Sequence, residues 1–417
     1  MRDASIATTC CVTGGGPAGM MLGFLLARAG VDVVVLEKHA NFFRDFRGDT
    51  IHPSTLELMY ELGLLDRFLK VPHQKLERLA IQVGDTRLQM LDLTHLPTHC
   101  KYIALMPQWD FLNFLAECGK RYKTFHVRMQ TEATDLIEEN GRIVGVHASG
   151  PDGELAIHAD LVVAADGRHS TLRARAGLQG DDYGSPMDVL WFRLTRRQTD
   201  EPEMFGHIEM GAMLVMIDRR DYWQCAFVIP KGGMDRVKAG GLDAFRARVV
   251  KMSPYLADRI NELKSWDDIK LLSVAVDRLR QWWRPGLLCI GDAAHAMSPI
   301  GGVGVNLAVQ DAVAAANILG PRFSASGVTE ADLAAVQRRR ELPTRLTQGL
   351  QVIVQNRVIT SVLRGTGTPR PPLALRLLGA LPILQRIPAR VIGMGFRPEH
   401  VRTSPAPLPV PPATFSG

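Results

Sequence analysis

The sequence predicts an α/β fold in which a largely parallel sheet is joined to a second, β-rich domain and is closed by C-terminal helices. Three observations predict this fold. A short strand runs through a glycine-rich turn into an apolar helix and then into a second strand. Two apolar segments far downstream each end in an acidic residue beside a glycine. A strand-rich stretch and a long helical stretch complete the chain.

The first element is a β-α-β unit at the N-terminus. Residues 6–13 predict a strand, 20–29 an apolar helix and 31–36 a second strand, which ends at Glu37. Parallel strands joined by one helix are the unit from which Rossmann-type sheets are built.

The glycines of the turn have the spacing of a dinucleotide site. Gly14 permits a tight turn, Gly16 lets a pyrophosphate approach the backbone, and Gly19 lets helix and strand pack closely. The start of the helix offers N–H groups and partial positive charge to that pyrophosphate. Glu37 can accept hydrogen bonds from a ribose hydroxyl. The predicted nucleotide contacts of this unit are Gly14, Gly16, Pro17, Ala18, Gly19, Glu37 and Lys38.

Two more strands are predicted to end at the same place. Residues 161–165 lead into Asp166-Gly167, and residues 287–290 lead into Gly291-Asp292. Uninterrupted apolar runs of this length fit strands that are covered on both faces. Because ligands of open α/β sheets bind beyond the carboxyl ends of the strands, Glu37, Asp166 and Asp292 should converge on one crevice.

A second glycine-rich turn follows Asp292. Gly301, Gly302 and Gly304 precede a helix predicted over residues 305–319, and Pro299 stiffens the turn before them. This arrangement predicts a second helix N-terminus that a ligand can approach closely and that favours negative charge.

In their order and separation these motifs resemble those of the flavoprotein aromatic hydroxylases, the fold family of para-hydroxybenzoate hydroxylase, over residues 6–345. The resemblance implies an FAD-dependent monooxygenase that takes electrons from NADH or NADPH. It further implies that dioxygen reacts with the reduced flavin to form a C4a-hydroperoxide, which hydroxylates a small aromatic substrate. The nicotinamide is expected to bind transiently in a groove.

The resemblance also assigns roles to residues. Asp166 would serve FAD and nicotinamide binding, Asp292 would bind flavin-side hydroxyls, and the 301–306 backbone would hold the isoalloxazine ring. Arg47 and Gln108 match an arginine and a polar residue near the cofactor, with surface ion pairing and helix capping as their alternatives. The further predicted FAD contacts are Arg47, Gln108, Asp166, Gly167, Gly291, Asp292, Pro299, Gly301, Gly302, Val303, Gly304, Val305 and Asn306.

The catalytic residues stay unknown at this stage. The phenol-binding tyrosines, serines and arginines of the best-studied family members have no recognisable equivalents in this sequence. His295, near Asp292, is interpreted as a structural hydrogen-bonding residue. No HExxH or CxxC pattern predicts a metal site, and no GxSxG motif predicts acyl transfer.

The domain organisation is predicted to be interleaved, with the second sheet roofing the flavin. The predicted ranges are 1–72, 100–182 and 266–345 for the FAD-binding domain, 73–99 and 183–265 for the substrate domain, 346–402 for C-terminal helices, and 403–417 for a proline-rich tail. Candidate pocket-lining side chains, each more readily explained as ordinary packing, are Trp191, Phe192, His207, Met213, Met216, Tyr222 and Trp223.

Three other functions share the scaffold. A flavin-dependent halogenase would require halide, but the Trp-x-Trp-x-Ile-Pro signature is absent and residues 223–230 are a loose echo of it. An isoprenoid-type flavin reductase would form product without oxygen. A flavoprotein that has lost catalysis would keep the intact FAD motifs and bind only a ligand or partner.

The composition of the chain argues against several other classes of protein. The net charge of +6 is not concentrated in a short run, which argues against nucleic-acid binding. No stretch of about 20 uncharged apolar residues predicts a membrane span. Residues 373–384 are interpreted as a packed helix pair, with a membrane-surface patch as the alternative. Six cysteines without a CxxC pair fit a reducing, cytoplasmic location. The oligomeric state is not predicted.

Overall fold

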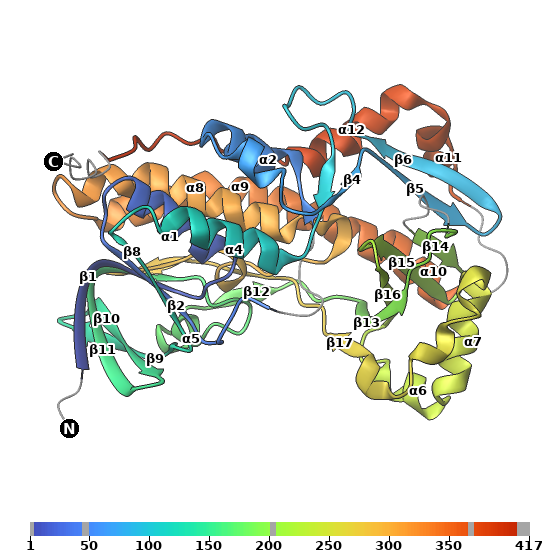
Figure 1. Ribbon diagram of the computed structural model, residues 1–417, viewed down its shortest axis with the longest axis horizontal. Helices are drawn as coiled ribbons and strands as arrows, with labels where there is room; N and C mark the ends of the chain where they lie inside the picture. Colours follow the sequence, from blue (N-terminus) through green and yellow to red (C-terminus); the bar gives the residue numbers. More distant parts are fainter. Residues whose placement is uncertain (1–3, 44–49, 201–205, 366–370, 407–417) are drawn as a thin grey trace, which may run out of the picture.

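The computed structural model describes residues 4–43, 50–200, 206–365 and 371–406, and it confirms the predicted α/β class (Figure 1). The main sheet has the order β19-β20-β11-β1-β2-β8, and β10 and β9 extend it from β11. Its strands are β1 (Ala4–Thr13), β2 (Val33–Glu37), β8 (Phe125–Met129), β9 (Glu132–Glu139), β10 (Arg142–Gly150), β11 (Gly153–Ala164), β19 (Trp283–Arg284) and β20 (Leu287–Cys289).

The strands that carry the motifs are parallel. β1 pairs in parallel with both β2 and β11, and β20 pairs in parallel with β11. Their carboxyl ends therefore meet at one edge of the sheet.

Helices cover one face of the main sheet and create the largest core cluster (Figure 1). They are α1 (Pro17–Arg28), α2 (Pro53–Glu61), α3 (Leu65–Phe68), α4 (Gln108–Gly119) and α8 (Gly304–Phe323). Among the described residues, one helical stretch, Ile300–Phe323, is long and apolar enough to cross a membrane, and 72% of its most apolar window is buried inside the protein. This burial is what the central helix of a core requires.

The second sheet has the order β17-β13-β16-β15-β14-β5-β6. Its strands are β5 (Arg78–Val83), β6 (Thr86–Asp92), β13 (Met187–Thr195), β14 (Gly206–Glu209), β15 (Ala212–Asp218), β16 (Tyr222–Pro230) and β17 (Lys270–Leu272). One face packs on α7 (Leu242–Met252), next to α6 (Met234–Ala239), and the other face turns towards the glycine-rich turn at residue 300. β17 belongs to this sheet although it lies inside the range 266–345 predicted for the FAD-binding domain; the domain boundaries stay a prediction.

Two small sheets complete the strands. β3 (Thr50–Ile51), β7 (Ile103–Leu105) and β4 (Gln74–Leu76) form one, and β12 (Gly180–Asp182) pairs with β18 (Asp277–Leu279) in the other. A short helix, α5 (Thr171–Arg175), follows β11.

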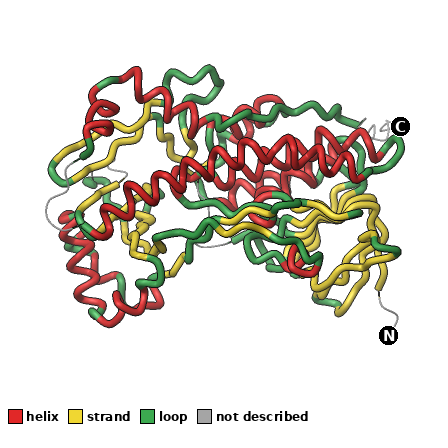
Figure 2. The backbone as a smooth tube through the Cα atoms, turned by 180° about the vertical axis from the view of Figure 1, so that it is seen from behind, coloured by secondary structure: helices red, strands yellow, loops and turns green. Residues whose placement is uncertain are grey.

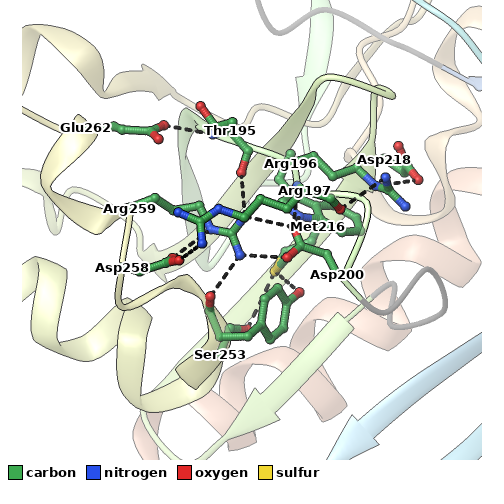
Figure 3. A network of polar contacts seen from close by, with 12 residues as sticks. Thr195, Arg196, Arg197, Asp200, Met216, Asp218, Ser253, Asp258, Arg259 and Glu262 are labelled. Carbon is green, nitrogen blue, oxygen red and sulfur yellow. Dashed lines mark hydrogen bonds and ion pairs between the residues drawn. The ribbon is translucent and has the colours of Figure 1, made fainter.

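A buried ion pair braces the second sheet where β13 ends and β16 begins (Figure 3). The Arg259 guanidinium donates to both carboxylate oxygens of Asp200 at 3.0 and 2.7 Å, and the Trp223 indole N–H donates to the same carboxylate at 2.8 Å. A third contact, from Arg259 to the Thr195 carbonyl at 3.1 Å, reaches the end of β13. This network is a structural brace, since the Asp200 carboxylate and the Thr195 carbonyl accept these hydrogen bonds within the protein.

One helical rod bridges the two sheets. α9 (Glu330–Val354) continues through a π-helical turn (Gln355–Ile359) into α10 (Thr360–Arg364). α9 contacts β19 of the main sheet, and α10 contacts β15 and β16 of the second. Figure 2 shows this long helix running along the back of the molecule, over both groups of strands.

The chain ends with α11 (Leu373–Ala380), α12 (Pro382–Gly393) and an extended segment that returns to α1 (Figure 1). Within that segment the Arg28 guanidinium donates to the Thr403 carbonyl at 2.6 Å, and Ala406 N–H donates to the Arg28 carbonyl at 2.8 Å. Residues 403–406 of the predicted proline-rich tail are therefore docked, and residues 407–417 lie outside the described part of the chain.

Candidate cofactor and active site

The first glycine turn has the geometry of a nucleotide cradle. Gly14 has φ +103°, and a Cβ placed on it would lie 2.3 Å from the Ala165 carbonyl oxygen. A Cβ on Gly19 would lie 2.0 Å from the Gly14 carbonyl oxygen, so only glycine fits where helix meets turn. A Cβ on Gly16 would meet nothing within 4 Å, and no side chain caps the N-terminus of α1. The turn thus leaves open space and helix-end N–H groups together, as an anion site needs.

The structure brings all three acidic strand ends to this turn. A Cβ on Gly15 would lie 2.9 Å from the Glu37 carboxylate, and a Cβ on Gly14 would lie 2.8 Å from the Cα of Asp166. On the remaining side, a Cβ on Gly291 would lie 3.1 Å from the Cβ of Ala18. The crevice expected from the sequence therefore exists, with the first turn at its centre.

Two members of the predicted set differ in exposure beside the turn. Glu37 is 8% exposed and its Oε1 accepts the His39 N–H at 3.0 Å. The Lys38 side chain is about half exposed and pairs with Glu132 at 3.4 Å, which directs it to the surface. Glu37 is therefore the better placed of the two for a ribose hydroxyl.

One carboxylate oxygen of Asp166 has no hydrogen-bond partner among the described residues. This oxygen, Oδ1, is buried, while Oδ2 accepts the Leu172 N–H at 3.4 Å. Burial raises the pKa of Asp166 despite these local donors. A ligand hydroxyl at this oxygen would satisfy the group, so the site fits a hydroxyl-rich cofactor. Nearby, Asp292 lies 3.9 Å from Arg168.

The second glycine turn is held in place by residues 50–55. Gly301 and Gly302 have φ of +76° and +63°, and the Thr50 hydroxyl donates to the Gly302 carbonyl at 2.8 Å. The Asn306 Oδ1 accepts the His52 N–H at 2.8 Å, and its Nδ2 donates to the Thr50 carbonyl at 3.0 Å. The Asn306 side chain is thus engaged within the protein, and the turn can offer a ligand only its backbone there.

An ion network lies behind the Gly291-Asp292 turn. Asp311, fully buried in α8, accepts from His295 Nε2 at 2.6 Å and from Arg340 Nε at 2.9 Å. Its Oδ2 also accepts the Gly291 N–H at 3.1 Å, so the network positions the turn. Burial alone would raise the pKa of Asp311, but His295 and Arg340 outweigh it and hold the pKa below its usual range. His295 is therefore structural, as its sequence context indicated.

A cavity of about 230 Å³ opens beside the second glycine turn. Its lining is mostly apolar and comes from the turn, α9 and α12. Side chains that contribute to it include Ile300, Val303, Leu350, Val354, Val391 and Ile392. An apolar cavity next to a predicted cofactor turn is the expected shape of a substrate site.

Because side chains alternate along a strand, the candidate pocket residues of the second sheet fall on its two opposite faces. Trp191 and Met213 pack against the same hydrophobic cluster as Ile300, which lines the cavity, although neither of them lines it. The opposite face carries Phe192, Met216 and Trp223, which belong to the core on α7. Trp191 and Met213 are therefore the candidates that the fold directs towards the site.

The structure does not connect every predicted residue to the two glycine turns, and some residues that position these turns were not predicted. Gln108 is the first residue of α4, and no hydrogen bond among the described residues links it to either glycine turn. Arg47 lies outside the described residues. The contacts of Thr50, His52 and Arg340 were not predicted, since they depend on pairings across more than 25 positions. Asp311 had a readable signal, because it is an acid inside the apolar run 305–319.

Comparison with known proteins agrees with this geometry. Residues 7–349 match the family model described as "FAD binding domain". The chain is 32% identical over 398 residues to 6-methylpretetramide 4-monooxygenase of Streptomyces rimosus, covering 95% of this chain and 94% of that protein.

Solved structures support the fold alone. PqsL of Pseudomonas aeruginosa has a TM-score of 0.71 at 22% identity, covering 86% of this chain and 97% of that one. The myxobacterial chondrochloren halogenase CndH has a TM-score of 0.70 at 19% identity, covering 91% and 97%. The fold therefore does not separate hydroxylase from halogenase, whereas the sequence relative does. The chain belongs to the FAD-binding-domain family, and it is an FAD-dependent monooxygenase of the aromatic-hydroxylase type.

Proposed function

We propose that this monooxygenase hydroxylates a small aromatic substrate bound in the cavity beside the second glycine turn. The main support for this proposal is the position of the apolar cavity, which borders Gly301, Val303 and Asn306. The relative from Streptomyces rimosus supports the substrate class, since its name states oxygenation of 6-methylpretetramide.

In the predicted binding mode the first glycine turn holds one part of FAD and the second glycine turn holds another. Gly16 and the start of α1 would hold the pyrophosphate, and Glu37 would accept a ribose hydroxyl. Asp166 and Asp292 would take hydroxyls nearer the flavin, and the 301–306 backbone would hold the ring. When bound, FAD supplies the transfer of electrons from the nicotinamide to dioxygen.

The protein's own contribution is binding, orientation and exclusion of water. The helix ends place partial positive charge at both turns, which favours negative charge on whatever they hold. Apolar side chains such as Val303 and Ile392 line the cavity, and exclusion of water by such a lining would limit wasteful release of hydrogen peroxide. Trp191 and Met213 would support the sheet side of the site, since they pack against the same cluster as the cavity-lining Ile300.

The test is oxygenation itself. The purified protein, loaded with FAD, is mixed with NADH or NADPH under air, with phenols, polycyclic aromatics and 6-methylpretetramide as candidate substrates, in halide-free buffer. We expect substrate-stimulated nicotinamide oxidation and a product heavier by one atom of oxygen, labelled when ¹⁸O₂ is used. Product formation without oxygen, or only with added halide, would instead establish a reductase or a halogenase.

We further propose a cytoplasmic location. All six cysteines are free and buried in the fold. A chain that keeps buried thiols unpaired fits a reducing compartment.

A further inference from the structure

Two short helices, α11 and α12, form an outer corner of the molecule next to β5 and β6 (Figure 1). Their inner side is anchored, because Ala389 and Gly393 are buried and α12 packs on β6. Their outer side is apolar and open: Leu373 is 68% exposed, Ile383 67% and Ile387 64%. Isolated exposed leucines are ordinary, but such a row marks an interaction surface.

An exposed arginine follows each of these side chains after three residues. Arg376 follows Leu373, and Arg386 and Arg390 follow the isoleucines of α12. Residues three apart are neighbours on a helix surface, so each of these three side chains has a guanidinium beside it. Apolar side chains bordered by arginines are typical of helices that lie in a lipid headgroup region.

The net positive charge of the chain belongs to the sequence segment that contains these helices. Residues 342–398 contain eight arginines and no aspartate, glutamate or lysine. Removing these eight from the chain's 49 basic residues leaves 41 against 43 acidic ones, so the net positive charge resides in this segment. In the described parts of the chain, no ion pair involves Arg376 or Arg390.

The apolar surface continues on α9 to the mouth of the cavity. Leu342, Leu346, Leu350 and Ile353 recur at helical spacing on α9 and are exposed. Leu350 also lines the cavity, together with Val391 and Ile392 of α12. The corner therefore joins a positively charged apolar surface to the opening of the candidate active site.

We propose that α11 and α12 dock the enzyme on an anionic lipid surface, with the exposed leucines and isoleucines in the acyl boundary and the arginines on the headgroups. The charge selects this occupant, because a second copy of the chain would bring arginines against arginines. The proposal goes beyond the proposed function and does not depend on turnover.

The experiment measures vesicle binding of the full-length, FAD-loaded protein by flotation. One set of vesicles is pure phosphatidylcholine, and the other contains one third phosphatidylglycerol. The first variant is L373S/I383S/I387S, and the second is R376Q/R386Q/R390Q. The matched control is R236Q/K238Q/K251Q, which removes three exposed positive charges from α6 and α7 on the second domain.

We expect at least tenfold stronger partitioning onto the anionic vesicles, lost at high salt, and at least a tenfold decrease in either α11–α12 variant. The control should stay within twofold of the wild type, and all proteins should keep their flavin absorbance. Absence of binding to anionic vesicles, or binding by both α11–α12 variants that equals binding by the wild type, would overturn the proposal. A wild type that ignores vesicles but dimerises in light scattering, with dimers lost in the serine variant, would assign the surface to a second copy.

Discussion

His295 Nε2 lies 2.6 Å from Asp311 Oδ2, and both side chains are buried. The contact links the Gly291-Asp292 turn to α8. On its other oxygen Asp311 meets Arg340, which in turn lies 3.3 Å from Glu399 in the C-terminal segment. One carboxylate therefore connects the candidate cofactor turn, the central helix, α9 and the returning chain end.

Replacing Asp311 with asparagine should lower the free energy of unfolding by about 3 kcal/mol, because the change leaves the buried Arg340 charge undercompensated. Urea unfolding at pH 7 measures it, with D152N, at an exposed turn, as the control. A loss below about 1 kcal/mol would show that Glu399 alone compensates Arg340.

The substitutions Gly16→Ala and Gly19→Ala should distinguish a glycine that leaves room for the ligand from a glycine that is needed for packing. A Cβ on Gly16 enters open space, so we expect the flavin-free stability to change by less than about 0.5 kcal/mol while the FAD Kd rises at least tenfold. A Cβ on Gly19 meets the Gly14 carbonyl, so we expect a stability loss of about 1–3 kcal/mol. Urea unfolding and flavin titration of the apoprotein measure both. Unchanged FAD affinity in G16A would show that the pyrophosphate does not bind at this turn.

The convergence of the motifs could be predicted because it follows from topology. Once the apolar runs before Glu37, Asp166 and Asp292 are parallel strands, their ends must share an edge of the sheet. The spacing of the glycines likewise predicted which of them is needed for packing and which faces open space. These features depend on local pattern and on one general rule of sheet architecture.

Other contacts had no local signal. The hydrogen bonds from Asn306 to residues 50–55 join segments about 250 positions apart, and no periodicity encodes them. Residues 373–384 do form a helix pair, but the apolar pattern could not show which side the rest of the fold covers. Leu373 and Leu377 face outward because β6 receives the opposite side of the helices.

His52 should make stability depend on pH below neutrality. Burial lowers the pKa of His52 to about 4, although the bond from Nδ1 to the Ile392 carbonyl opposes the shift. The unfolded chain therefore takes up the proton first. The stabilisation is fully present above about pH 6.5 and is lost as the pH falls towards 4, by about 3 kcal/mol in total.

The variant H52N tests this assignment, since asparagine can still donate to the Ile392 carbonyl but does not titrate. Urea unfolding between pH 7.5 and 4 should show a smaller decrease for the variant than for the wild type. Parallel curves for the two proteins would show that other groups cause the pH dependence.

Asp166→Asn should stabilise the apoprotein and weaken FAD binding. Because burial raises the pKa of Asp166, the folded state holds this proton more tightly than the unfolded chain, and ionisation costs stability at neutral pH. Asparagine removes that charge but offers its ligand one acceptor fewer. We expect a higher unfolding midpoint without FAD, and an FAD Kd raised at least tenfold, with D160N on the exposed side of β11 as the control. A variant with unchanged FAD affinity would mean that the buried Oδ1 serves the fold alone, and the ligand hydroxyl would then have to be sought at Asp292.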